Sequence, residues 1–270
     1  MVATGLVREQ WEETIRSKDL IRRLMDQGNA APSQPFGVYR IEPQTGTPHW
    51  ALPVARLAEA DVFAFYGDTP EDLEREYGPY DPYSTFFILI DHANGLPAGM
   101  LRVIRRSPLG FKSLTDIESS EPGRYWNLPL TQALQAAAVD FGPKTTLDMV
   151  TMGVVPAYHR HAYSGRIAKA IYHMACKYTL EQAARYWVTI VDESAHNSFK
   201  RRLGEPFSYY EGIGWKPYLG SSLSLPVWVD IEDWMARLCV NDPKRFGWLF
   251  RGEGLQEVFK FPAFTGPTPA

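Results

Sequence analysis

The alternation of apolar and polar positions is clearest between residues 146 and 193, where its period changes twice. Residues 147–155 are mostly apolar and rich in β-branched side chains, and Pro156 ends this run because proline cannot continue a central ladder. From Ser164 onward, apolar residues recur every three or four positions, as on one face of a helix. Residues 187–191 are again apolar, as in a buried strand. The pattern predicts strand, loop, helix and returning strand, which is a crossover unit.

A hairpin is the next clear signal. Residues 84–90 and 97–104 are apolar and β-rich, and between them lies Asn94-Gly95, a strong turn dipeptide. Helices are predicted at 4–27, at 57–66 and from Thr69, where threonine, proline and an acidic residue form a helix start. The remaining predicted elements are strands at 36–41 and 225–231 and helices at 130–141 and 194–203.

The loop before the helix at Ser164 has features of an anion site. The first-turn amides of a helix lack partners within it and carry the positive end of its dipole. Ser164 is suited to the N-cap, Gly165 allows close approach to the backbone, and Arg160 and Arg166 add positive charge. These features fit either a bound anionic group or an ordinary helix start with solvated basic residues.

Composition narrows the class of protein. The chain has 270 residues, of which 45% are hydrophobic and 22% charged, as in a globular domain with a substantial core. Its formal charge of -3 gives no general attraction to nucleic acid, which we exclude as a partner. No apolar run approaches the roughly 18 residues of a membrane span, and no signal peptide is recognisable, so we expect a cytoplasmic protein without membrane insertion. Cys176 and Cys239 form neither a disulfide framework nor a metal motif.

The order of residues around this loop resembles the GNAT superfamily of acyl-CoA-dependent acyltransferases. The matching positions are Val154, Pro156, Tyr158, Arg160, Gly165, Ala168, Asn197, Leu203 and Gly204. The resemblance implies an α/β (α+β) fold with a central mixed, mostly antiparallel sheet and helices on both faces. It also implies acyl-CoA or acyl-4'-phosphopantetheine as donor. The residues that it assigns to donor binding are Val154, Val155, Arg160, His161, Ser164, Gly165, Arg166 and Asn197. Arg160 lies five residues before Gly165, so this loop is longer than the family's pyrophosphate loop.

The upstream half is similar to a narrower group, the acyl-homoserine-lactone synthases and the long-chain N-acyl amino acid synthases. The residues in common order are Arg56, Val62, Phe63, Glu76, Tyr80, Asp81, Thr85, Leu101 and Arg102. Where the lactone synthases have a Glu-x-x-Arg pair, this chain has Asp148 and Thr151, so the acidic residue is kept and the arginine is not. This similarity implies transfer of a fatty acyl chain to an amino group, with acyl carrier protein as a further possible partner.

Acyl transfer to an amine needs a base and a donor to the oxyanion. The resemblance places the oxyanion donor among the backbone amides of residues 152–155. Our candidates for the base are Asp148, Glu193 and Asp81, because each lies beside a strand end where the cleft should open, and partial burial raises a carboxyl pKa. Each of them could instead cap a helix or pair with arginine. Arg102, at the outgoing end of the hairpin, either is an ordinary solvated strand-end residue or pairs with Asp81 or Asp148 and shapes the acceptor site.

Two histidines deserve a separate hypothesis. His159 and His161 would share one face of a strand, and His196 or Asp192 could complete a metal site. The spacing is common and lacks partners at a recognised interval, so we expect no metal.

The sequence thus predicts an N-terminal helical extension (1–32), a GNAT-like domain (33–235) and a C-terminal tail (236–270). The predicted function is transfer of an acyl group longer than acetyl from a thioester to the amino group of an amino acid or related small amine. Two alternatives remain: a small-acyl or acetyl-CoA-dependent N-acetyltransferase, and a non-catalytic binding or sensing module of the same fold.

Overall fold

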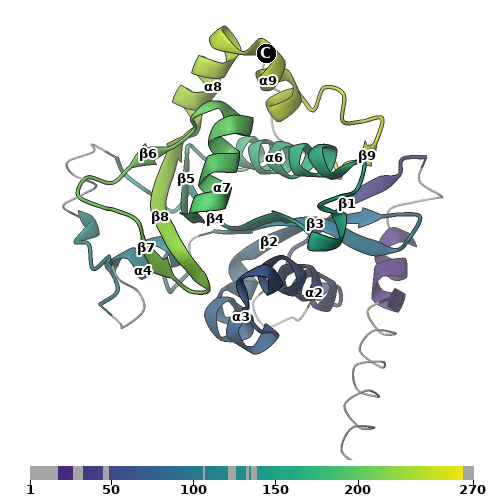
Figure 1. The fold of residues 1–270 in the computed structure, drawn as a ribbon, viewed down its shortest axis with the longest axis horizontal. Coiled ribbons are helices and arrows are strands. Elements are labelled where there is room, and N and C mark those ends of the chain that lie inside the picture. Colours follow the sequence, from purple (N-terminus) through teal and green to yellow (C-terminus); the bar gives the residue numbers. More distant parts are fainter. Residues whose placement is uncertain are drawn as a thin grey trace, which may run out of the picture.

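A single mixed sheet organises the molecule. The computed structural model describes residues 18–26, 33–44, 49–105, 107–120, 126–131, 134 and 139–263. Within these residues nine strands form the sheet in the order β6-β8-β5-β4-β3-β2-β1-β9, and β7 also pairs with β8 (Figure 1). The pairs β4–β5 and β1–β9 are parallel, and the other pairs are antiparallel. The strands are β1 (Phe36–Ile41), β2 (Ser84–Asp91), β3 (Leu96–Ile104), β4 (Thr146–Val154), β5 (Tyr186–Asp192), β6 (Ser208–Tyr209), β7 (Lys216–Tyr218), β8 (Ser221–Asp230) and β9 (Phe259–Lys260).

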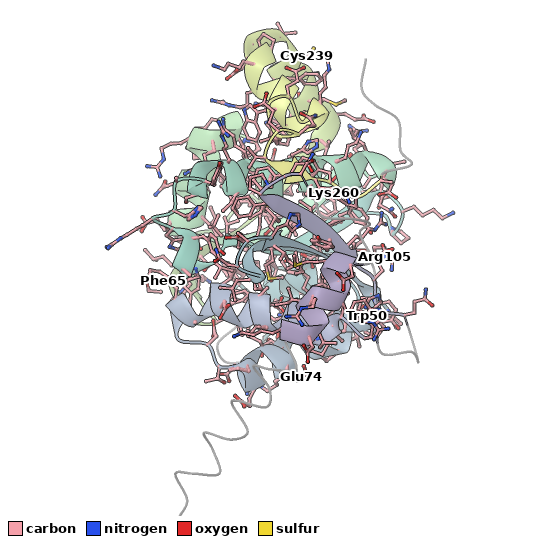
Figure 2. All side chains as sticks on the ribbon, turned by 90° about the vertical axis from the view of Figure 1, so that its right-hand side faces the viewer. Trp50, Phe65, Glu74, Arg105, Cys239 and Lys260 are labelled. Atoms are coloured by element: carbon pink, nitrogen blue, oxygen red, sulfur yellow. The ribbon has the colours of Figure 1, made fainter. Side chains whose placement is uncertain are left out.

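Helices cover both faces of the sheet. The α-helices are α2 (Leu52–Phe63), α3 (Pro70–Tyr77), α4 (Lys112–Glu118), α6 (Ser164–Glu181), α7 (Glu193–Phe199), α8 (Ile231–Asn241) and α9 (Pro243–Phe246). Residues 18–26 are also helical. In Figure 1, α2 and α3 lie below the sheet, and α6, α8 and α9 lie above it. Figure 2 shows the same separation, with Glu74 of α3 at one end of the molecule and Cys239 of α8 at the other.

The alternation of side chains along β2 explains the two layers. Successive residues of a strand point to opposite faces. Phe87 and Leu89 are fully buried in the core that contains α6, whereas Phe86 and Ile88 are fully buried in the core that contains α2. The strand is buried along its whole length because both of its faces are covered.

Most of the predicted elements are confirmed. The hairpin is β2 and β3, the crossover unit is β4, α6 and β5, and strand β1 has the predicted bounds. At Thr69 the structure has a full capping box with Asp72, with Pro70 in the first turn. The helix predicted at 57–66 begins earlier, at Leu52, and its last residues form the 3₁₀ turn η1 (Ala64–Tyr66). The helix predicted at 194–203 divides into α7 and a π-helical turn, η4 (Lys200–Gly204).

The C-terminal segment contains regular structure that the sequence pattern did not predict. Helix α8 runs across the predicted boundary at 235/236, and the segment continues through α9 and the π-helical turn η5 (Gly247–Arg251) to β9. Strand β9 pairs with β1, and the buried ring of His173 on α6 lies 2.7 Å from the carbonyl oxygen of Leu249. The segment therefore packs on the main core, while the three-part division of the chain stays a prediction. Of the predicted N-terminal helix, residues 4–17 and 27 lie outside the described residues.

Strand β4 contains the irregularity that matters for the site. Its pairing with β3 shifts between Thr151, opposite Arg102, and Met149, opposite Val103, so Val150 is an extra residue. Such a bulge bends the strand and increases its local twist. On its other edge β4 pairs with β5 only from Thr146 to Asp148, after which the two strands part.

Candidate acyl-transfer site

A cavity of about 150 Å³ lies where β4 and β5 part. One wall comes from β4 at residues 149–152 and another from β5 at Trp187 and residues 189–192. The rest of the lining comes from the end of α2, the turn η1, Asp68, the end of α3, helix α7 with η4 and the loop after it, and the strands β7 and β8 with the loop between them. Its apolar lining consists of Val62, Phe63, Met149, Val150, Met152, Trp187, Ile190, Val191, Ala195, Phe199, Leu203, Pro206, Phe207 and Leu219. Such a lining suits a hydrocarbon chain.

Backbone N–H groups of β4 point toward the gap between the strands. The N–H of Val155 donates to the carbonyl of Ala98 on β3 at 3.0 Å. Because N–H groups alternate between the two edges of an antiparallel strand, those of Val154 and Met152 point to the opposite edge. There the ladder with β5 has already ended at Asp148. This edge can therefore donate hydrogen bonds to a bound thioester or amide, whereas Val155 is engaged in the ladder.

Two residues of the cavity form a hydrogen-bonded pair that the sequence did not suggest. Tyr66 donates its hydroxyl proton to Oδ2 of Asp192 at 2.8 Å. The other oxygen, Oδ1, accepts the backbone N–H groups of Ser194 and Ala195, so Asp192 is the N-cap of α7. Burial and the adjacent Asp192 raise the pKa of Tyr66, which stays protonated. The carboxylate is consequently held in one orientation at the cavity wall.

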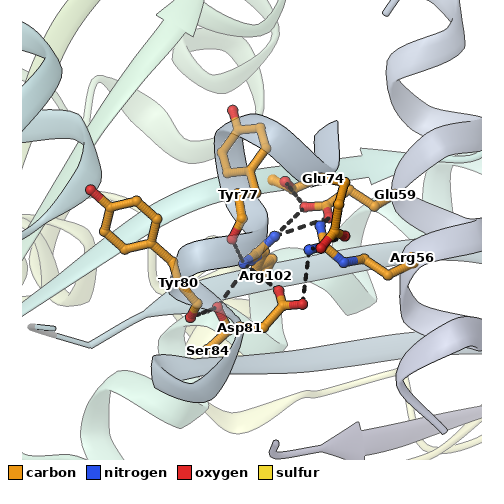
Figure 3. A network of polar contacts seen from close by, with 9 residues as sticks. Arg56, Glu59, Glu74, Tyr77, Tyr80, Asp81, Ser84 and Arg102 are labelled. Atoms are coloured by element: carbon orange, nitrogen blue, oxygen red, sulfur yellow. Dashed lines mark hydrogen bonds and ion pairs between the residues drawn. The ribbon is translucent and has the colours of Figure 1, made fainter. Parts of the chain in front are cut away.

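Arg102 lies in a buried polar network on the α2 side of β4 (Figure 3). Its guanidinium pairs with Asp81 at 2.8 Å and with Glu59 at 3.0 Å. The predicted Arg102–Asp81 pair is confirmed, and Asp148 takes no part in it. Glu59 was not predicted. It is fully buried on α2 and also accepts a hydrogen bond from Thr151, a cavity residue of β4, at 2.8 Å.

Arg56 extends this network toward the surface. It pairs with Glu59 at 3.1 Å, Asp81 at 2.8 Å and the exposed Glu74 at 3.0 Å. Burial raises the pKa of Asp81, and the guanidiniums of Arg102 and Arg56 oppose that rise. Asp81 is thus a doubly paired carboxylate rather than a free group facing the cavity, whose lining does not include it.

Asp148 is fully buried at the point where the strands part. Its two oxygens accept the backbone N–H of Ser113 at 2.8 Å and the hydroxyl of Ser113 at 2.6 Å. Burial raises the pKa of Asp148 to about 7, although the hydrogen bonds from Ser113 act in the opposite direction. Asp148 therefore anchors the first turn of α4 and can exchange a proton near neutral pH. The cavity lining begins at the next residue, Met149.

None of the residues predicted to bind the donor belongs to the lining of the cavity. Glu193, in the first turn of α7, is exposed and does not line the cavity. The exposed residues of the predicted donor site are Arg160, His161, Gly165, Arg166 and Asn197. The ring of His161 stacks on Tyr163, with centroids 5.7 Å apart. The assignment of these residues to donor binding stays a prediction.

The predicted N-cap at Ser164 is wrong. The N-cap of α6 is Tyr163, and it makes no side-chain cap hydrogen bond. The N–H of Ser164 donates to the carbonyl of His161 at 2.9 Å, so the turn of the loop runs directly into the helix and Ser164 is already its first residue. At Gly165 the space where a Cβ would lie is open.

The structure also shows where the histidines of the metal-site hypothesis lie. The ring of His159 lies 3.0 Å from the carbonyl oxygen of Val154, and His196 stacks on Phe207 with centroids 5.3 Å apart. Within the described ranges no three His, Cys, Asp or Glu side chains are arranged to hold a metal ion.

None of the helices within the described residues is long and apolar enough to cross a membrane.

Comparison with known proteins identifies similar folds among solved structures. No protein-family model and no curated protein matches the sequence. Among solved structures, FeeM, an N-acyl amino acid synthase from uncultured soil microbes, is 15% identical with a TM-score of 0.50, over 75% of this chain and 96% of that chain. BjaI, a CoA-dependent acyl-homoserine lactone synthase, is 11% identical with a TM-score of 0.46, over 87% of this chain and 94% of that chain. The spermidine N-acetyltransferase of Vibrio cholerae is 9% identical with a TM-score of 0.41, over 73% and 98%.

The similarity to FeeM confirms the predicted fold, a GNAT-like arrangement in which a mostly antiparallel sheet has helices on both faces. It also confirms, at the level of the fold, the predicted resemblance to an N-acyl amino acid synthase. The candidate site consists of the cavity, the edge of β4 that is not paired with β5, and the carboxylates of Asp192 and Asp148.

Proposed function

We propose that the protein is an N-acyltransferase that moves an acyl group longer than acetyl from a thioester of CoA or acyl carrier protein to the amino group of an amino acid or related small amine. The observation that carries the proposal is the apolar cavity between the parted strands β4 and β5, bordered by the open edge of β4. The shared fold with an N-acyl amino acid synthase supports it.

In this proposal the chain acts chiefly by positioning. The acyl chain lies along the apolar lining, and the N–H groups of Met152 and Val154 donate to the pantetheine amide or to the thioester oxygen. A backbone donor aimed at the developing oxyanion lowers the barrier because it needs no reorganisation during the reaction. Asp148 lies on β4 where the strands part and Asp192 lies at the end of β5, and in this proposal one of these two carboxylates accepts the proton that the amine must lose.

The test is a direct assay of the purified protein. Acetyl-, octanoyl- and myristoyl-CoA are each incubated with a mixture of amines and amino acids, and N-acyl products are identified by mass spectrometry. We expect products from the longer donors. Replacing Ala195, a cavity residue, by tryptophan should abolish them by filling the cavity. The matched control is Val240→Trp, at a position on α8 that is 80% exposed.

The result that would overturn the proposal is the absence of product with every donor, together with no rise in melting temperature on addition of any acyl-CoA. Such a rise is required if a ligand binds the folded state alone. Products from acetyl-CoA only would favour a small-acyl transferase, and thioester binding without product would favour a non-catalytic module.

A further inference from the structure

The charges that line the cavity have one sign. Among the described residues that line the cavity, the ionisable acidic side chains are Asp68 and Asp192, and none is a lysine, arginine or histidine. Burial, together with the carboxylates of Asp72 and Glu76, raises the pKa of Asp68. The carboxylate of Asp192 therefore faces an acceptor without a cationic side chain beside it among the described lining residues, and an acceptor carboxylate would have no partner of opposite charge there.

Arg102, which donates to the carbonyl of the lining residue Tyr77, cannot supply that cation. Arg102 lies behind Thr151, and its donors bond to Ser84, Glu59, the carbonyl of Tyr77 and Asp81. These contacts engage all three nitrogens of the guanidinium, Nε, Nη1 and Nη2. Figure 3 shows the side chain enclosed by these partners.

Arg56 and Lys112 are also committed to carboxylates. Arg56 and Arg102 together face three of them, namely Glu59, Glu74 and Asp81. Lys112, on α4, is 2% exposed and pairs with Asp116 at 2.5 Å and Glu76 at 3.4 Å. In both groups the acidic side chains outnumber the basic ones, so neither group adds positive potential to the cavity.

Asp192 keeps capacity for one more donor. A carboxylate offers about four lone-pair sites. The N–H groups of Ser194 and Ala195 occupy Oδ1, and the hydroxyl of Tyr66 occupies one site on Oδ2. One lone-pair site of Oδ2 has no donor among these contacts, and Asp192 is a lining residue of the cavity. An ammonium group is the donor that this site favours, because the contact pairs opposite charges in an apolar surrounding.

We propose that the acceptor is a cationic amine that carries no carboxylate, and that Asp192 binds its ammonium group. This inference rests on the proposed function and narrows it from amino acids or amines to amines. The proton passes from the ammonium to Oδ2 of Asp192, and the nitrogen lone pair forms the bond to the thioester carbonyl carbon. The C–S bond then breaks, the thiolate takes the proton from Asp192, and the second N–H proton leaves to water.

Acceptor pairs that differ only in the carboxylate test this directly. We would compare 1,5-diaminopentane with lysine and phenethylamine with phenylalanine, using the acyl-CoA that gives most product. The expected kcat/KM is roughly 10- to 100-fold higher for the amine of each pair. The amino acid has to bury its carboxylate without a partner, and leaving one charged group unpaired costs a factor of about that size.

The Asp192→Asn variant separates a charge effect from a structural one. Asparagine also caps helices well, so α7 should keep its first turn. The preference for the amine over the amino acid should shrink toward equality, because the negative charge is gone, whereas a merely structural defect would lower both rates alike. The matched control is Asp230→Asn, which alters the N-cap of α8 at a residue outside the cavity lining and should leave the preference unchanged.

The outcomes divide cleanly. Equal or faster acylation of the amino acids, or an unchanged preference in Asp192→Asn, would overturn this inference and leave the proposed acyltransferase standing. Absence of transfer to every acceptor, with no binding of any thioester, would overturn both.

Discussion

Glu59 is the residue on which the buried polar network depends. It is fully buried, and it accepts hydrogen bonds from Arg56, Arg102 and Thr151. Removing its charge leaves the guanidinium of Arg102 buried with one carboxylate fewer. Breaking a buried ion pair by removing one partner costs about 3–5 kcal/mol. We therefore expect Glu59→Gln to lower the free energy of unfolding, measured by urea denaturation, by that amount.

Glu74 provides the control for this prediction, because it pairs with the same Arg56 but its side chain is 71% exposed. An exposed ion pair contributes about 0–1 kcal/mol, so Glu74→Gln should have little effect. Equal, small losses in the two variants would contradict the role assigned to Glu59.

At the residue scale the sequence predicted part of this network. One of the two partners predicted for Arg102, Asp81, does pair with it, whereas the other, Asp148, does not. Glu59 was missed because a glutamate in an amphipathic helix is ordinarily solvent-exposed, although its spacing of three residues from Arg56 was a usable signal. The Tyr66–Asp192 pair joins residues 126 positions apart, and no local pattern predicts such a contact.

The elements predicted best are those whose local chemistry already determines their shape. The Asn94-Gly95 turn fixes the β2–β3 hairpin, and the capping box at Thr69 fixes the start of α3. The short C-terminal elements were missed, since α9, η5 and β9 are each five residues or fewer and have too few turns for a period to appear. Their structure depends on the core against which they pack.

The contact between Asp148 of β4 and Ser113 in the first turn of α4 should depend on pH. The pKa of Asp148 in the folded protein is about 7, above the ordinary value of 3.8. A raised pKa means that the folded state holds the proton more tightly than the unfolded state, so its stabilising contribution is complete below pH 4 and is lost as the pH rises to about 7. The expected loss between these limits is about 4 kcal/mol.

Comparison of the wild type with Asp148→Asn tests this anchor. Asparagine is neutral throughout, so the difference in free energy of unfolding between the two proteins should change in favour of the variant as the pH rises from 4 to 8. Urea denaturation at several pH values measures it. A difference that is constant with pH would show that Asp148 does not change its protonation on folding in this range.

The whole molecule explains why a cavity exists at this place. Strand β4 pairs with β3 along most of its length but pairs with β5 over three residues only. The extra residue Val150 bends β4 just after its pairing with β5 ends. Neither the bulge nor the parting of the strands follows from the apolar run at 147–155, which would fit a regular strand equally well. The apolar pattern therefore predicts the sheet, the resemblance to known enzymes predicts a cleft at these strand ends, and the position of the bulge follows only from the pairing of distant strands.

The C-terminal segment should unfold together with the sheet rather than separately. Phe250 is fully buried and belongs to the same core as Phe87 of β2 and Ile171 of α6. Replacing a buried phenylalanine by alanine costs about 3–5 kcal/mol, so Phe250→Ala should lower the melting temperature of one cooperative transition. Val240→Ala, at the exposed position on α8, should change stability by about 0.5 kcal/mol or less. Calorimetry that resolved a separate early transition in Phe250→Ala, with the main transition unmoved, would instead mean that the segment is an independent unit docked on the sheet.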